Sequence, residues 1–239
     1  MGLTIHYTLV APPDTDAARA RELVRAMRRH ALGSKHRGRV DNVLPIGDGP
    51  KELRLAMDYQ SIPHPTRPGT FTGIEIAPEV GFIFPVLVGR DCEPLWLGLC
   101  RYPKTVPHAD RRHRTRLAGW CFSRFSKTQY ASLHGWEHFR RCHTAATDLL
   151  QGFRKLGIAV NITDEGEYWP GRSLAALRKN LDEMNGLVAA MAGRLKDGDA
   201  QVESPIFQHA RFERLEAEGE AKMGVRIRQA GKAVADLLA

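Results

Sequence analysis

The sequence predicts an α+β fold with a mixed, mostly antiparallel sheet, packed helices and a C-terminal helical hairpin. Strand-like and helix-like segments alternate near the N-terminus as a β-α-β unit, and closely spaced strands then follow as a meander. Long segments with helical periodicity occupy the C-terminal part. We therefore expect an α+β domain over residues 1–170 and a helical hairpin over residues 171–239, packed on that domain or on a partner.

The β-α-β opening rests on a change of apolar period. In residues 3–10 apolar and polar side chains alternate, which is typical of a strand with one buried face. Apolar residues then recur at helical spacing over residues 17–32, and Asp14 or Asp16 caps this helix. Residues 40–46 form the second strand.

Strands dominate the next part of the chain. Three segments, 71–77, 81–88 and 94–102, are rich in apolar, β-branched and aromatic residues, and their simplest arrangement is an antiparallel meander. The arginine-rich segment 104–116 is expected to be an exposed loop. Residues 117–125 follow as one more strand.

Helical patterns return in the second half. They predict a helix that begins at Ser132 and ends at Gly157, followed by a short strand over residues 158–163. Ser173 caps the next helix, and Ser-Pro at 204–205 starts the last one. The last helix either completes the core of its own chain or pairs with another chain, as in a homodimer or a protein complex. The apolar stripes of the hairpin are Leu174, Leu177, Leu181, Met184, Val188, Met191 and Leu195 in one helix and Leu215, Met223, Ile227, Ala230, Val234 and Leu237 in the other.

The composition is that of a globular protein. Hydrophobic residues make up 43% of the 239 residues, which is enough for a core. No apolar run approaches the roughly 20 residues that span a bilayer. The N-terminus lacks the basic flank and long apolar segment of a secretory signal. We expect a cytoplasmic protein without membrane association.

The four cysteines, Cys92, Cys100, Cys121 and Cys142, contain no C-x-x-C pair. In a reducing compartment they are expected to be buried small apolar residues. The alternative is a zinc site that combines some of them with a histidine, which their irregular spacing does not favour.

A net charge of +8 is the main compositional lead. Basic residues cluster at 28–39 and 111–116, and such clusters attract nucleic acid, nucleotides or anionic membrane. The alternative is an ordinary solvated surface. Because no helix-turn-helix, zinc-finger or RNA-recognition signature is present, nucleic-acid binding is expected to be sequence-tolerant. Its candidate residues are Arg111, Arg112, Arg114 and Arg116.

The stretch "HGWEH" matches the inverted zinc-peptidase motif H-x-x-E-H. In such a peptidase His134 and His138 would bind the metal, and Glu137 would activate the bound water. The competing interpretation is a polar helix surface on which Glu137 pairs with Arg140 or Arg141. We favour the surface interpretation and keep the zinc peptidase as a minor alternative.

His143 is the main candidate for acid–base chemistry, because it lies within the apolar stripe of its helix and is expected to point inward. Asp164 or Glu165, at the end of a strand, would orient the imidazole or take a divalent metal ion. Lys127 would neutralise an anionic substrate, so the predicted ligand is a nucleotide or nucleic acid. The substrate-binding candidates are Lys127, Gln129, Tyr130, Tyr168 and Trp169.

Each of these candidates also has a structural interpretation. An inward histidine is more often a satisfied core residue than a catalyst, and the two acids suit turn formation and capping. Residues 126–132 suit a polar loop that caps a helix. The sequence therefore leaves open whether the protein is an enzyme or a non-catalytic binding or assembly module, and it identifies no cofactor.

Six phrases in the chain, "MGLTIHY", "LGLCRYP", "KTQYAS", "RCH", "DEGEYW" and "AGRLKD", resemble in wording and order a group of uncharacterised bacterial proteins. The resemblance covers residues 1–197, and the final helix is an addition to it. It implies a bacterial cytosolic setting. It implies no activity, cofactor or site residue.

Overall fold

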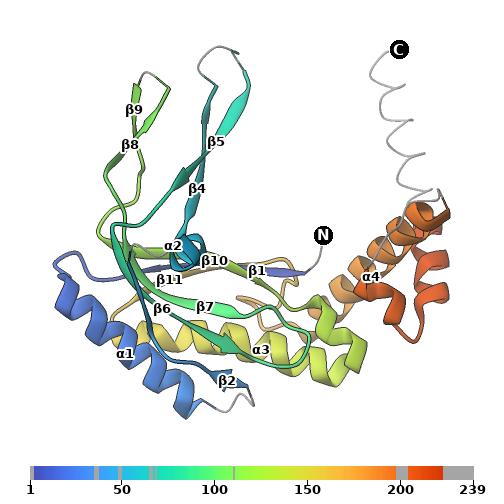
Figure 1. The fold of residues 1–239 in the computed structure, drawn as a ribbon. Helices are drawn as coiled ribbons and strands as arrows, with labels where there is room; N and C mark the ends of the chain where they lie inside the picture. Colours follow the sequence, from blue (N-terminus) through green and yellow to red (C-terminus); the bar gives the residue numbers. More distant parts are fainter. Residues whose placement is uncertain are drawn as a thin grey trace.

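The α+β fold class is confirmed by the computed structural model. A seven-stranded sheet has the strand order β11–β1–β10–β7–β6–β2, with β3 also paired to β6. All its strand pairs among the described residues are antiparallel (Figure 1). The residues that the structure describes are 3–34, 38–47, 50–64, 67, 69–109, 111–197 and 204–222.

Two further pairs of strands form small sheets of their own, β4 with β5 and β8 with β9. The strands are β1 (Thr4–Val10), β2 (Arg39–Val40), β3 (Leu44–Ile46), β4 (Asp58–Pro63), β5 (Phe71–Ile76), β6 (Val80–Leu87), β7 (Leu95–Arg101), β8 (Thr105–His108), β9 (Arg111–Arg114), β10 (Trp120–Lys127) and β11 (Ala159–Asp164). The helices are α1 (Ala17–Gly33), α2 (Pro50–Ala56), the 3₁₀ helix η1 (Gln129–His134), α3 (Trp136–Gly152), the 3₁₀ helix η2 (Phe153–Leu156), α4 (Leu174–Asp197), the 3₁₀ helix η3 (Pro205–Gln208) and a helical segment at 212–222.

The larger core lies between the sheet and helices α1 and α3 (Figure 1). The β-α-β opening is confirmed, although the single second strand predicted at 40–46 is divided into the two short strands β2 and β3. Asp16 is the residue that caps α1, by accepting a hydrogen bond from the backbone N–H of Arg19. The helix buries the stripe that its period predicts, because those positions share one face. Its buried residues are Ala20, Leu23, Val24, Met27 and Ala31.

A second, smaller core lies against α2 and the bases of the paired strands β4 and β5. The predicted meander is only partly correct, because β6 pairs with β7 but β5 pairs with β4. The prediction missed α2 and β4. The expectation of a loop at 104–116 was wrong, since β8 and β9 form a hairpin there. The two hairpins project as arms from the side of the sheet opposite α1 and α3 (Figure 1).

The C-terminal helices divide their packing between two cores. Ser173 caps α4 as predicted. Its hydroxyl oxygen accepts a hydrogen bond from the backbone N–H of Ala176 at 3.1 Å. Leu177 and Leu181 join the larger core, whereas the second half of α4 packs on η3 and residues 212–222. Leu174, Met191 and Leu195 of the predicted stripe are exposed.

Of the predicted stripe on the last helix, only Leu215 lies among the described residues, and it is buried. Met223, Ile227, Ala230, Val234 and Leu237 lie outside them. The domain boundary at residue 170 and association through the C-terminal helices stay predictions.

Candidate functional site

His143 lies in a buried chain of hydrogen bonds that joins three segments of the fold. Its Nδ1 is 2.8 Å from the hydroxyl of Thr128, which follows β10. Its Nε2 is 3.0 Å from a carboxylate oxygen of Asp164, the last residue of β11. The structure therefore brings together two of the three predicted catalytic residues and adds a threonine that the sequence reasoning did not select.

The carboxylate of Asp164 is surrounded by donors. One oxygen accepts the backbone N–H of Gly166 at 2.8 Å, and the other accepts those of Tyr168 and Trp169, each at 3.0 Å. Burial opposes ionisation of Asp164. The hydrogen bond and charge of His143 and the backbone N–H groups nevertheless outweigh burial and hold the pKa of Asp164 below its ordinary value.

Gly166 is required for close packing. A Cβ at Gly166 would lie 2.6 Å from a methyl carbon of Leu177 and 3.1 Å from an oxygen of Asp164. The turn itself is made by Glu167, whose φ is 55°. The "DEGEYW" stretch is thus folded tightly around the Asp164 carboxylate.

The buried chain favours a structural role for His143. The side chains of His143 and Asp164 have no exposed surface. Both ring nitrogens are occupied, and the imidazole packs between the rings of Phe139 and Tyr168. Neither nitrogen is accessible to a substrate in this arrangement, so the site links α3, β10 and β11 as a satisfied polar network.

Glu165 and Lys127 point to other partners. The Glu165 carboxylate accepts the backbone N–H of Thr4 at 2.9 Å and lies 3.5 Å from the imidazole of His6. The Lys127 ammonium lies 3.7 Å from Glu93. They do not converge on the buried His143.

The remaining substrate-binding candidates also serve the fold. Gln129 is buried, accepts the backbone N–H of Leu3 and donates to Asn185 on α4. Tyr130 is half-buried. Tyr168 and Trp169 both lie against the guanidinium of Arg172, at 5.4 and 5.2 Å from the ring centres.

The H-x-x-E-H residues have separate partners. His134 contacts the carboxylate of Asp91, and His138 lies 3.1 Å from the carbonyl of Arg90. Glu137 pairs with Arg140, as the surface interpretation predicted. Within the described part of the chain, no group of three or more His, Cys, Asp or Glu side chains is arranged to hold a metal ion.

The four candidate arginines lie on or beside the β8–β9 hairpin, and all four are exposed. Arg112 donates to the hydroxyl of Thr105 across the hairpin at 2.8 Å. None of the four forms an ion pair with a carboxylate of the described residues. Residues 104–116 contain five Lys and Arg residues and a single acidic residue.

The outer face of β11, β1 and β10 is open. His6 pairs in register with Phe125 on one side and Thr163 on the other, so the three side chains share one face, and all three are exposed. The rings of His6 and Phe125 are 5.9 Å apart, and the Lys127 ammonium lies 5.8 Å from the centre of the Phe125 ring.

A hollow of about 350 Å³ lies over this face, and Tyr59 of β4 lines it together with His6 and Phe125. Tyr59 is 63% exposed, and Phe71 on the paired strand β5 is 70% exposed. No pattern in the sequence singles out these aromatic residues. The alternation of residues 3–10 did place His6 on the outer face of its strand, but exposure of Phe125 and Tyr59 depends on which strands cover them.

Comparison of the chain with models of protein families, with curated proteins and with solved structures finds no match. In the described residues no helix has the length and apolar character needed to span a membrane.

Proposed function

We propose that the protein binds single-stranded nucleic acid without sequence preference, through phosphate contacts on the β8–β9 hairpin and base stacking on the open face of the sheet. The observation that carries this proposal is an arginine-rich arm beside exposed aromatic side chains. Proteins that bind single strands in this way combine a positive surface that follows the backbone with aromatic side chains on which bases stack.

The arginines are suited to phosphates because they are exposed and do not pair with described carboxylates. A guanidinium held in an ion pair would first have to break that contact. Arg111, Arg114 and Arg116 are instead available for bidentate contacts to phosphate oxygens.

The aromatic residues are suited to bases because they combine exposure with fixed positions. Phe125 is 48% exposed on the central strand β10, and His6 supports its ring from the neighbouring strand. Apolar rings exposed to water cost free energy, and a planar base that covers them removes that cost. Tyr59 faces the same hollow from β4.

The arm and the open face are neighbours. The amide of Gln60, next to Tyr59 on β4, donates to the carbonyl of Thr115 at the end of the arginine hairpin. Figure 1 shows the two hairpins projecting on the same side of the sheet. A strand whose bases lie at Tyr59 and Phe125 therefore has its phosphates within reach of the arginine arm.

The other basic cluster, at 28–39, does not belong to this surface. Arg28 donates to the carbonyl of Asp41 and the side chain of Asn42, and Arg39 pairs with Asp41 at 2.9 Å. The members of this cluster that belong to α1 lie on the opposite side of the sheet from the hairpins (Figure 1). Arg29 of this cluster and the neighbouring Arg25 of α1, both exposed, supply matched control residues.

The test is fluorescence anisotropy with labelled single-stranded oligonucleotides of several sequences. The double variant Arg111→Glu/Arg114→Glu is compared with the control Arg25→Glu/Arg29→Glu, two exposed arginines of α1. Each lost phosphate contact lowers the salt slope of a single-strand complex by about 0.7, so the hairpin variant should lose about 1.4. The control should keep the wild-type slope.

Phe125→Ala separates stacking from charge. It should weaken binding about 5- to 150-fold, since stacking on an aromatic side chain contributes about 1–3 kcal/mol per base, and it should leave the salt slope unchanged. The proposal fails if the wild-type protein does not bind single strands at low salt. It also fails if both arginine variants weaken binding equally, because the contact would then be general attraction to a basic protein.

A further inference from the structure

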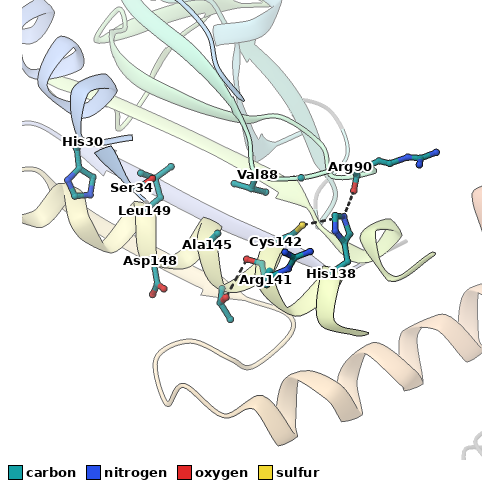
Figure 2. A pocket seen from close by; sticks show the side chains of 12 residues that line it. His30, Ser34, Val88, Arg90, His138, Arg141, Cys142, Ala145, Asp148 and Leu149 are labelled. Atoms are coloured by element: carbon teal, nitrogen blue, oxygen red, sulfur yellow. Dashed lines mark hydrogen bonds between the residues drawn. The ribbon is translucent and has the colours of Figure 1, made fainter. Parts of the chain in front are cut away.

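A cleft of about 660 Å³ lies on the helical side of the molecule, away from the open sheet face (Figure 2). Its walls are the end of α1, the connection between β6 and β7, and one face of α3. The α3 residues that line it recur at helical spacing from His138 to Leu149, so the cleft follows the helix axis for about 16 Å. Its volume is within the range of small-molecule sites.

Two glycines allow the other walls of the cleft to lie close against α3. A Cβ at Gly89, in the β6–β7 connection, would overlap the sulfur of Cys142 on α3. A Cβ at Gly152, at the end of α3, would overlap the imidazole of His30 on α1. The cleft is thus bounded by packed backbone, which keeps its shape when no ligand is present.

The middle of the cleft is apolar. Val88 and Leu149 are buried hydrophobic residues of its lining, and Ala145 between them on α3 is half-buried. Figure 2 shows Val88 on the strand side and Ala145 on the helix side of the cleft. Water next to these carbon atoms is displaced favourably by an apolar group, so the middle suits the apolar body of a ligand.

One end of the cleft carries an unpaired positive charge. Arg141 is exposed, lies one helical turn after His138, and forms no ion pair with a carboxylate of the described residues. Nε2 of His138 donates to the carbonyl oxygen of Arg90 at 3.1 Å, because a carbonyl only accepts hydrogen bonds. The guanidinium of Arg90 lies 3.6 Å from Asp91 and points away from the cleft (Figure 2). Arg141 is therefore the cation available to a ligand.

The other end of the cleft has no free cation of this kind. Asp148, the acidic residue of the lining, pairs with the guanidinium of Arg172. It follows Arg141 by seven residues, which places it about 10 Å further along the helix. The hydroxyl of Ser34 at this end already donates to the carbonyl of Ala31. An anionic group is therefore favoured at Arg141 and an uncharged group at the Asp148 end.

We propose that this cleft binds a small monocarboxylate with an elongated apolar body. The carboxylate lies on Arg141, and the body follows α3 toward Leu149. A guanidinium presents two parallel N–H groups that match the two oxygens of a carboxylate. The site lies across the sheet from the nucleic-acid surface proposed above, so it does not depend on that function.

The experiment is isothermal titration calorimetry of the full-length protein with decanoate below its micelle concentration. The wild-type protein should bind decanoate at a single site. Decanamide has the same apolar chain without the charge and should bind about tenfold more weakly, because its contact with Arg141 lacks charge on the acceptor. Acetate, which has the charge without the chain, should give no measurable binding.

Two variants test the two ends of the ligand separately. Arg141→Gln should weaken decanoate binding about tenfold and change decanamide binding by less than twofold. Arg140→Gln is the matched control, because Arg140 pairs with Glu137 and does not line the cleft. It should bind decanoate like the wild type.

Ala145→Phe places a ring in the middle of the cleft and should abolish decanoate binding while far-UV circular dichroism stays unchanged. Ala175→Phe adds the same ring at an exposed position of α4 and should bind decanoate normally. The variant Arg111→Glu/Arg114→Glu should also bind it normally, since its substitutions lie across the sheet.

The proposal is overturned if the wild-type protein does not bind decanoate, or if a folded Ala145→Phe protein binds it with wild-type affinity. The assignment of the carboxylate to Arg141 is overturned if decanoate and decanamide bind equally. Equal losses in Arg140→Gln and Arg141→Gln would overturn it as well, because the attraction would then be a general effect of positive charge.

Discussion

Replacement of Asp164 by Asn tests whether the buried chain around His143 holds the fold together. Asparagine has nearly the same shape as aspartate but exchanges one acceptor oxygen for an NH₂ donor. Both oxygens of Asp164 accept backbone N–H groups, one from Gly166 and two from Tyr168 and Trp169. In either orientation of the amide, its NH₂ group therefore faces at least one of these backbone N–H groups, and two donors cannot form a hydrogen bond.

The less costly orientation places the amide nitrogen toward Gly166. The N–H of Gly166 is then buried without a partner, which costs about 1–3 kcal/mol. The bonds that remain to the side chain at position 164 lose the assistance of a negative charge. The combined loss is about 3 kcal/mol. For a chain of this size, this lowers Tm by about 6–12 °C.

The pH dependence supplies a second readout. The pKa of Asp164 is lower in the folded protein than in the unfolded chain, where it is about 3.9. Its contribution to stability is therefore fully present above about pH 4 and is lost as the pH falls through the folded pKa. The difference in free energy of unfolding between wild type and Asp164→Asn should be constant from about pH 5 to 7 and should shrink below about pH 4.

The assay is urea unfolding followed by far-UV circular dichroism across this pH range. Asp182→Asn is the matched control, because Asp182 pairs with Arg178 on the surface of α4 and is 54% exposed. It should change the free energy of unfolding by less than about 0.5 kcal/mol. An Asp164→Asn protein with wild-type stability at pH 7 would refute the structural role assigned to this network.

Two further predictions concern the network around His143 and the contact between the C-terminal helices. His143→Gln should lower the free energy of unfolding by about 2–4 kcal/mol, because the buried side chains of Thr128 and Asp164 lose the ring that hydrogen-bonds to both of them. A Tm within a few degrees of the wild-type value would instead make His143 a catalytic candidate again. Gly219→Ala should cost about 1–3 kcal/mol in urea unfolding, since its Cβ would lie 1.9 Å from the backbone oxygen of Gly186 and force the C-terminal helices apart. Gly193→Ala is the matched control: the atoms nearest to its Cβ belong to the flexible side chain of Glu216, which can move away, so stability should be unchanged or higher.

Local patterns were enough for elements that are regular over many residues. Alternation gave the buried and exposed faces of β1, and the helical period gave the buried faces of α1 and α3, including the inward direction of His143. These predictions succeed because the period of the backbone alone decides which side chains share a face. The caps at Asp16 and Ser173 are equally local, since a capping side chain bonds within its own first turn.

Pairing between distant strands was not available from local patterns. The composition of the segment at 71–77 indicates a strand but does not indicate which strand it pairs with. In the structure it pairs with β4, outside the main sheet. The hairpin within residues 104–116 could not be predicted, because both of its faces contact solvent and its sequence therefore shows no alternation of apolar and polar residues. The exposure of Phe125 was hidden for a related reason, since an aromatic residue on a strand is usually covered.

The sequence by itself determined the fold class, the inward-facing histidine and the basic character of the segment at 111–116, since each depends on composition or on a period within one element. Only the tertiary structure decided what those residues meet. It joined His143 to Thr128 and Asp164 in a sealed network, and it placed Tyr59 of β4 over the same hollow as His6 and Phe125. Such contacts depend on how whole elements pack against one another, because the chain reverses direction many times between the residues involved and no local period records where it returns.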